Sequence, residues 1–180
     1  MKVFSLIILL GMMVNSSKLD IDFGIPTGGE NWMVINDGVM GGLSEGDAKL
    51  TEKSILFEGK VSLANNGGFA SLRCPYQDLD LSDYKTIKMR VRSQGIAFAF
   101  TLSTDRRFYI PYFKHDIKTK SNKWQTITLD LADFKQYQLG NATGVSLTQD
   151  YKDQIIRMGV ISNEKREGSF ELEIDYIKFE

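Results

Sequence analysis

Three acidic residues near the C-terminus have the spacing that acid–base chemistry would need. They occupy alternate positions of a strand-like segment, Glu171, Glu173 and Asp175, so their carboxylates share one face with neighbours about 7 Å apart. Two carboxyl groups about 5 to 9 Å apart could serve a glycosidase. A solvent-facing strand surface explains the same pattern, and we favour it. We expect an earlier basic strand to lie beside this one and to pair its charges; its residues are Lys88, Arg90 and Arg92.

Histidine and cysteine are too scarce for other common catalytic and metal sites. The chain has one histidine, His115, and one cysteine, Cys74, which disfavours triads with a histidine base and metal sites built from His and Cys ligands. Strand alternation places Cys74 among apolar neighbours, which predicts a small buried side chain and not a reactive thiol. A calcium site that joins Asp20 or Asp22 to Asp175 would need several more oxygen ligands. We therefore predict no catalytic residue, no metal and no cofactor.

Aromatic side chains are the residues that would hold a sugar ring. The candidates for such a site are Tyr109, Tyr112, Trp124 and Tyr137, and at least one of them has to be exposed on a concave surface. The segment 106–115 also mixes cations with aromatic rings, as sites for single-stranded nucleic acid do. With 22 basic and 23 acidic residues the net charge is −1, however, and strong binding of a phosphate backbone needs a basic surface. We expect no nucleic-acid partner.

Two glycine-rich stretches, residues 36–42 and 65–68, form the most unusual part of the backbone. Their Asn-Gly, Asp-Gly and Gly-Gly steps close tight turns because they tolerate positive φ. Met40 stands between glycines, so this apolar side chain needs a pocket of its own or of a partner. We predict a protein-binding site here with apolar anchors and one arginine, although Trp32 and Phe69 fit core positions equally well. The predicted binding residues are Trp32, Asp37, Met40, Gly41, Gly42, Asn66, Gly67, Gly68, Phe69 and Arg73.

Period-two alternation of apolar and polar residues predicts an all-β fold, an antiparallel β-sandwich or jelly roll. The clearest strands are 55–63, with Leu63 on the buried face, 87–92 and 170–175. Further strands are expected at 21–23, 32–35, 69–73, 97–102, 108–113, 124–129 and 157–162. Pro111 would place its strand at a sheet edge or a bulge. Short helices are expected only at 130–137 and near 151–155.

The first 17 residues differ in composition from the rest. Met1-Lys2 precedes twelve uncharged residues, Val3–Val14, and then Asn15-Ser16-Ser17, which predicts a signal peptide over residues 1–16. Twelve residues are too few to span a bilayer as a helix, so we expect no stable membrane anchor. Residues 17–180 have the length of a single domain. We expect export to the periplasm or the extracellular space; an uncleaved segment would instead hold the chain at the membrane.

The glycine-rich stretches and their flanking strands resemble the complex I intermediate-associated protein 30 domain family. The resemblance rests on Trp32–Ser44, Phe57–Leu63 and Asn65–Arg73, and it continues in Trp124–Phe134 and Gly168–Ile177. It implies a galactose-binding-like β-sandwich and, in mitochondrial members, a role in assembling respiratory complex I. We therefore expect a non-catalytic domain that binds another protein as an assembly factor or scaffold. A carbohydrate-binding module is the alternative, and a glycosidase-like enzyme is the third hypothesis.

Overall fold

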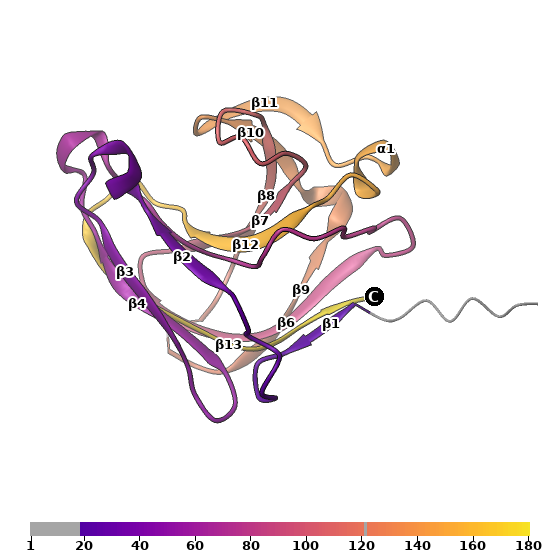
Figure 1. The fold of residues 1–180 in the computed structure, drawn as a ribbon, viewed down its shortest axis with the longest axis horizontal. Helices are drawn as coiled ribbons and strands as arrows, with labels where there is room; N and C mark the ends of the chain where they lie inside the picture. Colours follow the sequence, from indigo (N-terminus) through magenta and orange to yellow (C-terminus); the bar gives the residue numbers. More distant parts are fainter. Residues whose placement is uncertain (1–18, 121) are drawn as a thin grey trace, which may run out of the picture.

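Two antiparallel β-sheets packed face to face form a β-sandwich (Figure 1). This computed structural model describes residues 19–120 and 122–180. The six-stranded sheet has the order β3 (Glu45–Leu50), β4 (Ile55–Val61), β13 (Gly168–Phe179), β6 (Thr86–Gly95) and β9 (Gln125–Asp130), with β1 (Asp20–Asp22) also paired to β13. The seven-stranded sheet has the order β11 (Asn141–Ser146), β10 (Lys135–Gln138), β8 (Tyr112–Ile117), β7 (Phe98–Ser103), β12 (Arg157–Ser162), β5 (Ala70–Arg73) and β2 (Met33–Asn36). The predicted all-β sandwich is confirmed.

The core lies between the two sheets and is rich in aromatic residues. Phe57 and Phe170 come from the six-stranded sheet and Phe98 from the other, and their ring centroids lie 4.9 to 6.0 Å apart. All three side chains are buried. Because strand side chains alternate between the two faces, the inward position of these residues fixes which of their neighbours face outward. The apolar alternation therefore determines the composition of both outer surfaces.

The segment 106–115 forms less strand than its sequence predicts. A strand was expected at 108–113, but residues 108–111 lie in an irregular segment and β8 begins at Tyr112. Asp105 accepts hydrogen bonds from the backbone and side chain of Arg107, which supports the local turn. Pro111 has no N–H to donate, so pairing begins only after it. The expected edge position is also wrong, because β8 lies between β7 and β10.

The expected helix over 130–137 is replaced by a single 3₁₀ turn, η3 (Leu131–Asp133), followed by β10. Asp130 caps this turn by accepting a hydrogen bond from the N–H of Ala132. Leu131 and Phe134 are both buried, and their i, i+3 spacing resembles that of a helix face. The expected turn near 151–155 is present as the short helix α1 (Gln149–Lys152), which begins two residues earlier.

Three strands, β3, β10 and β11, lie in segments where the sequence predicts none. Leu63 was expected on the buried face, yet β4 ends at Val61 and Leu63 is exposed. In the described part of the chain no helix is long and apolar enough to cross a membrane. The expected signal peptide falls within residues 1–18, outside the described residues.

Candidate functional site

The two glycine-rich stretches meet around a single buried carboxylate, that of Asp37. This residue begins the 3₁₀ turn η1 (Asp37–Met40), which follows β2; the second stretch contains the turn η2 (Ala64–Asn66), which precedes β5. The Asp37 carboxylate accepts hydrogen bonds from the N–H and Oγ of Ser44, at 2.8 and 2.6 Å. It also accepts from the N–H groups of Gly68 and Phe69, at 2.6 and 3.2 Å. Asp37 thus joins two loops that are distant in sequence.

Burial opposes ionisation of Asp37, yet the hydrogen bonds from Ser44, Gly68 and Phe69 outweigh it and lower the pKa of the carboxyl group. The carboxylate also explains why glycine stands beside it. A Cβ atom on Gly42 would lie 2.4 Å from Cγ of Asp37, and one on Gly67 would lie 2.6 Å from its Oδ2. These residues were predicted to bind a partner, but the structure gives Asp37, Gly42 and Gly67 a role in holding the loops together.

Apolar side chains nevertheless reach the solvent from the two joined loops. Met40 is 64% exposed, and three further residues of these loops are also exposed: Val39, Leu43 and Leu63. We call these four residues the loop-tip cluster. Of the other predicted binding residues here, Gly41 and Asn66 are exposed, whereas Gly68 and Phe69 are half-buried. The side-chain amide of Asn65 donates to the Gly41 carbonyl, at 3.1 Å, which ties the loops together at their tips as well.

Trp32 and Arg73 do not belong to the loops. Trp32 precedes β2, at the strand's far end from η1, and packs edge to face against the buried Phe23 with a centroid distance of 5.2 Å. It therefore supports the core. Arg73 ends β5 and lies outside the sandwich, because its neighbours Leu72 and Cys74 are buried. The structure thus divides the predicted binding residues among the loops, the core and the outer face of the seven-stranded sheet.

Two rows of outward-facing residues cross this outer face. In the first row, successive cross-strand partners in β2, β5, β12, β7 and β8 are Met33, Arg73, Gly159, Thr101 and Lys114. In the adjacent row, the partners in β12, β7, β8 and β10 are Arg157, Ser103, Tyr112 and Tyr137. Gly159, Thr101 and Ser103 make a floor of small residues between arginines on one side and tyrosines on the other. We call Arg73, Tyr76, Tyr112, Tyr137 and Arg157 the arginine–tyrosine face.

The two arginines of this face lack carboxylate partners. Nε of Arg73 donates to Oγ of Ser71 at 3.0 Å, and Nε of Arg157 donates to the Cys74 carbonyl at 2.8 Å. Neither arginine forms an ion pair with a described residue. Arg157 is only 4% exposed, and its Nη2 has no hydrogen-bond partner among the described residues. Burial and the charge of Arg157 lower the pKa of Arg73, which indicates that the two cations repel each other.

The tyrosines of the face differ in how much of each ring is already covered. The Arg157 guanidinium stacks on Tyr76 at 4.3 Å, and Nζ of Lys114 lies 3.9 Å from the Tyr137 ring centroid. The ring of Tyr112 has no such cation and no aromatic partner in the described part of the chain. Burial raises the pKa of Tyr112, whereas the charge of Arg73 opposes this rise. Tyr112 is therefore the half-buried tyrosine of the face whose ring has no cation or aromatic partner among the described residues.

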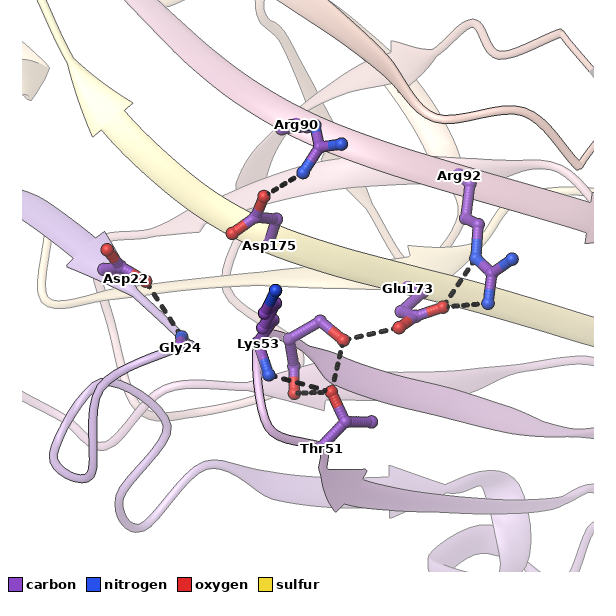
Figure 2. A network of polar contacts seen from close by, with 9 residues as sticks. Asp22, Gly24, Thr51, Lys53, Arg90, Arg92, Glu173 and Asp175 are labelled. Atoms are coloured by element: carbon purple, nitrogen blue, oxygen red, sulfur yellow. Dashed lines mark hydrogen bonds and ion pairs between the residues drawn. The ribbon is translucent and has the colours of Figure 1, made fainter.

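The outer face of the six-stranded sheet is organised differently (Figure 2). Arg92 pairs with Glu173 at 2.5 Å, and Arg90 pairs with Asp175. Glu173 also accepts a hydrogen bond from Oγ of Ser54. The expected pairing of the basic and acidic strands is confirmed, since β6 and β13 are neighbours. Arginines engage both of these carboxylates.

The predicted sugar-binding aromatic residues are divided between the two outer faces. Trp124 belongs to the six-stranded side, where Arg90 and Arg92 lie 4.8 and 5.3 Å from its ring. Tyr112 and Tyr137 are direct cross-strand partners on the seven-stranded sheet. Tyr109 is exposed in the segment before β8 and borders that same sheet, since its carbonyl accepts from Gln138 of β10.

Two hollows lie on the surface of the described structure. The hollow beside the loops, about 560 Å³, is lined by polar groups that include Lys60 and Glu167. A second hollow, of about 650 Å³, lies at the turn containing Gly95. Both are open, unlike the enclosed pockets that hold small ligands. Among the described residues no group of three or more His, Cys, Asp or Glu side chains is placed to hold a metal ion.

The predicted burial of Cys74 is confirmed, and burial raises the pKa of its thiol. Asp175, which we considered as a calcium ligand and did not predict to bind a metal, is paired with Arg90.

Comparison with known families agrees with the resemblance seen in the loops. The family described as Complex I intermediate-associated protein 30 (CIA30) matches residues 21–174. The chain belongs to the CIA30 family. The match includes both glycine-rich loops and β13 up to Ile174, so the features that CIA30 members share extend well beyond the Asp37 junction. No curated protein matches this CIA30 domain.

Solved structures similar to this CIA30 domain include carbohydrate-binding modules and agarases. The family 11 carbohydrate-binding module of the cellulosomal cellulase Lic26A-Cel5E of Clostridium thermocellum has a TM-score of 0.65 at 18% identity, covering 90% of this chain and 92% of that one. The same kind of module in complex with a β-1,3-1,4-mixed-linked tetrasaccharide has a TM-score of 0.62 at 17% identity, covering 89% and 94%. An agarase, AgWH50C, matches with a TM-score of 0.52 at 14% identity, covering 90% of this chain and 24% of that one. At these identities the likeness establishes the shared β-sandwich.

Sequence reasoning missed Arg157 and Tyr76, which complete the arginine–tyrosine face. A local indication existed for Arg157, because Met158 and Val160 alternate with it and point inward. That alternation predicts an outward arginine but not its neighbours. The neighbours follow only from the pairing of β12 with β5, which aligns Gly159 with Arg73.

Proposed function

We propose that this CIA30 domain is a non-catalytic glycan-binding domain whose ligand lies on the arginine–tyrosine face. The observation that carries the proposal is the half-buried ring of Tyr112, which has no cation or aromatic partner among the described residues, is adjacent to Tyr137 and lies across a floor of small residues from Arg73. The separation between β5 and β8 is three strand spacings, about 14 Å, which leaves room for a sugar ring between the arginines and the tyrosines.

The shape of this surface supports an extended ligand. The arginine–tyrosine face crosses β5, β12, β7, β8 and β10, which are successive strands of one sheet, so its residues lie along a single surface. An oligosaccharide can lie along such a surface and contact several side chains in turn. The likeness in fold to modules that bind carbohydrate is consistent with this proposal, and it includes one module in complex with a tetrasaccharide.

The test is affinity electrophoresis through gels that contain neutral or acidic polysaccharides, with Tyr112→Ala and the matched control Trp124→Ala. Trp124 is an aromatic residue on the opposite outer face, so its removal should leave retardation unchanged. We expect Tyr112→Ala to weaken the retardation at least tenfold, since a lost ring contact removes stacking area. Equal retardation of wild type and Tyr112→Ala, or loss only in Trp124→Ala, would contradict the proposal.

A second candidate function, a protein-binding assembly factor or scaffold, is supported by the loop-tip cluster. Exposed apolar side chains on loops held by buried hydrogen bonds are suited to dock on a partner. The family's name associates it with complex I intermediates. Chemical cross-linking in the native host, with wild type and Met40→Asp, tests this role. A defined cross-linked partner that is lost in Met40→Asp supports it, and an unchanged cross-linking pattern counts against it.

We also propose that the chain is exported, because residues 1–16 have the composition of a signal peptide. N-terminal sequencing of the protein from its native source checks this. A mature chain that begins near Ser17 supports export, whereas a retained Met1 with cytoplasmic recovery would contradict it.

A further inference from the structure

Arg73 and Arg157 are adjacent cations on the arginine–tyrosine face. Arg73 is the cross-strand partner of Gly159, and Arg157 lies two residues before Gly159 on the same face of β12. The two arginines are therefore diagonal neighbours, about 7 to 8 Å apart at their Cα atoms. Like charges at this spacing repel each other. The folded protein therefore contains an unfavourable electrostatic contact between Arg73 and Arg157.

No carboxylate among the described residues compensates the charges of this pair. Both Nε atoms are engaged by neutral oxygens, those of Ser71 and Cys74, and no described carboxylate pairs with either guanidinium. Nη2 of the nearly buried Arg157 lacks a partner among the described residues. Leaving such a donor unsatisfied is costly, and guanidinium groups bind planar oxyanions through parallel hydrogen bonds.

We propose that Arg73 and Arg157 form an anion subsite that takes the acidic group of a charged sugar residue, a carboxylate or a sulfate ester. This deepens the proposed function and rests on it, because the anion would be one substituent of a glycan lying on the arginine–tyrosine face. Arg73 is the half-buried member that meets the ligand first. Arg157 meets it from below, where the ring of Tyr76 now covers its guanidinium.

Selectivity for acidic glycans would come from this pair and not from the overall charge. The chain has a net charge of −1, so it has no general attraction for a polyanion. A neutral glycan would leave both guanidinium groups uncompensated. An acidic one would relieve their repulsion and engage the free Nη donors, which makes the acidic form the better ligand.

The experiment is affinity electrophoresis against three probes: sodium polygalacturonate, its carboxyl-reduced neutral form and κ-carrageenan, whose only acidic groups are sulfate esters. The variants are Arg73→Gln, Arg73→Lys and the control Arg90→Gln on the opposite face. We expect wild type to bind at least one acidic probe about tenfold more tightly than the neutral one. Arg73→Gln should abolish this preference, and Arg73→Lys should retain part of it, because lysine keeps the charge but loses the planar fork. Arg90→Gln should behave as wild type.

The outcomes separate this inference from the proposed function. Preference for polygalacturonate assigns the anion to a carboxylate, and preference for κ-carrageenan assigns it to a sulfate ester; both support the subsite. Equal binding of neutral and acidic probes, or acidic binding that survives Arg73→Gln, overturns the subsite while the glycan-binding proposal stands. If no probe retards the wild-type protein, the proposed function fails, and the subsite fails with it.

Discussion

The arginines on the two outer faces of this sandwich differ in whether they have carboxylate partners. On the six-stranded sheet, Arg90 and Arg92 each meet a carboxylate from the neighbouring strand (Figure 2). On the seven-stranded sheet, Arg73 and Arg157 meet only neutral oxygens among the described residues. Both faces follow from the same strand alternation, so alternation alone does not decide whether an arginine has a carboxylate partner. We infer that the paired charges stabilise the fold, whereas the unpaired ones are available to the proposed ligand.

The largest effect should come from Asp37, the carboxylate that joins the two glycine-rich loops. We expect Asp37→Asn to lower the free energy of unfolding by about 4 kcal/mol, because several buried donors lose a charged acceptor. Urea denaturation followed by circular dichroism measures this. A loss below about 1 kcal/mol would show that the loops do not depend on the carboxylate.

The pH dependence of stability gives a second measure of how much the Asp37 carboxylate stabilises the fold. Its folded-state pKa is lowered from the ordinary value of 3.8, so its stabilisation is complete above that value and is lost as the pH falls through the folded pKa. Stability of the wild type should therefore drop below about pH 4. In Asp37→Asn this part of the acid unfolding curve should flatten; identical pH slopes for both proteins would contradict the assignment.

Glu173 tests the outer face of the six-stranded sheet, where charges are paired. We expect its substitution to lower the free energy of unfolding by less than that of Asp37. Glu173→Gln removes the partner of Arg92 and the acceptor for Ser54, which should cost about 2 kcal/mol. The matched control is Glu171→Gln, two positions along the same face and outside the ion pairs of the described residues. It should change stability by less than about 0.5 kcal/mol. Similar losses in both variants would remove the distinction between paired and unpaired charge.

Arg73 tests the arginine–tyrosine face, where the arginines lack carboxylate partners. Its substitution should hardly change the free energy of unfolding. Arg73→Gln loses one hydrogen bond to Ser71 but also the repulsion with Arg157, so we expect a net change within about 1 kcal/mol. Thermal unfolding of the ligand-free protein measures it. A loss as large as that of Glu173→Gln would mean that Arg73 is structural, and the contrast between the faces would be wrong.

The smallest effect should come from Arg90, whose pair with Asp175 is open to solvent. Its side chain is 44% exposed, so Arg90→Gln should cost less than about 1 kcal/mol, and the cost should shrink in 0.5 M salt. Urea denaturation at two ionic strengths provides the check. A larger cost that is insensitive to salt would indicate a buried role for this pair.

Much of the fold, but only part of the candidate site, could be predicted from the sequence. Strong alternation identified β4, β6 and β13, whereas β3 and β11 were missed because glycine, alanine, aspartate and asparagine rarely mark strands. The glycine-rich loops were recognised, yet their meeting point at Asp37 depends on contacts between distant segments. Arg73 was found, but its partner Arg157 follows only from the pairing of β5 with β12. Local patterns predict which face a residue occupies; register between strands decides its neighbours.

The central claim is that the ligand lies on the seven-stranded face, and an NMR titration of isotope-labelled protein tests it most directly. Tetragalacturonate is the acidic probe and a mixed-linkage tetrasaccharide the neutral one. We predict that tetragalacturonate shifts the Arg73 Nε–H signal and the amides of Thr101 and Gly159, with weaker shifts from the neutral probe, while the Trp124 indole signal stays in place. Shifts confined to Trp124 and its neighbours Arg90 and Arg92, or no shift with either probe, would contradict the claim.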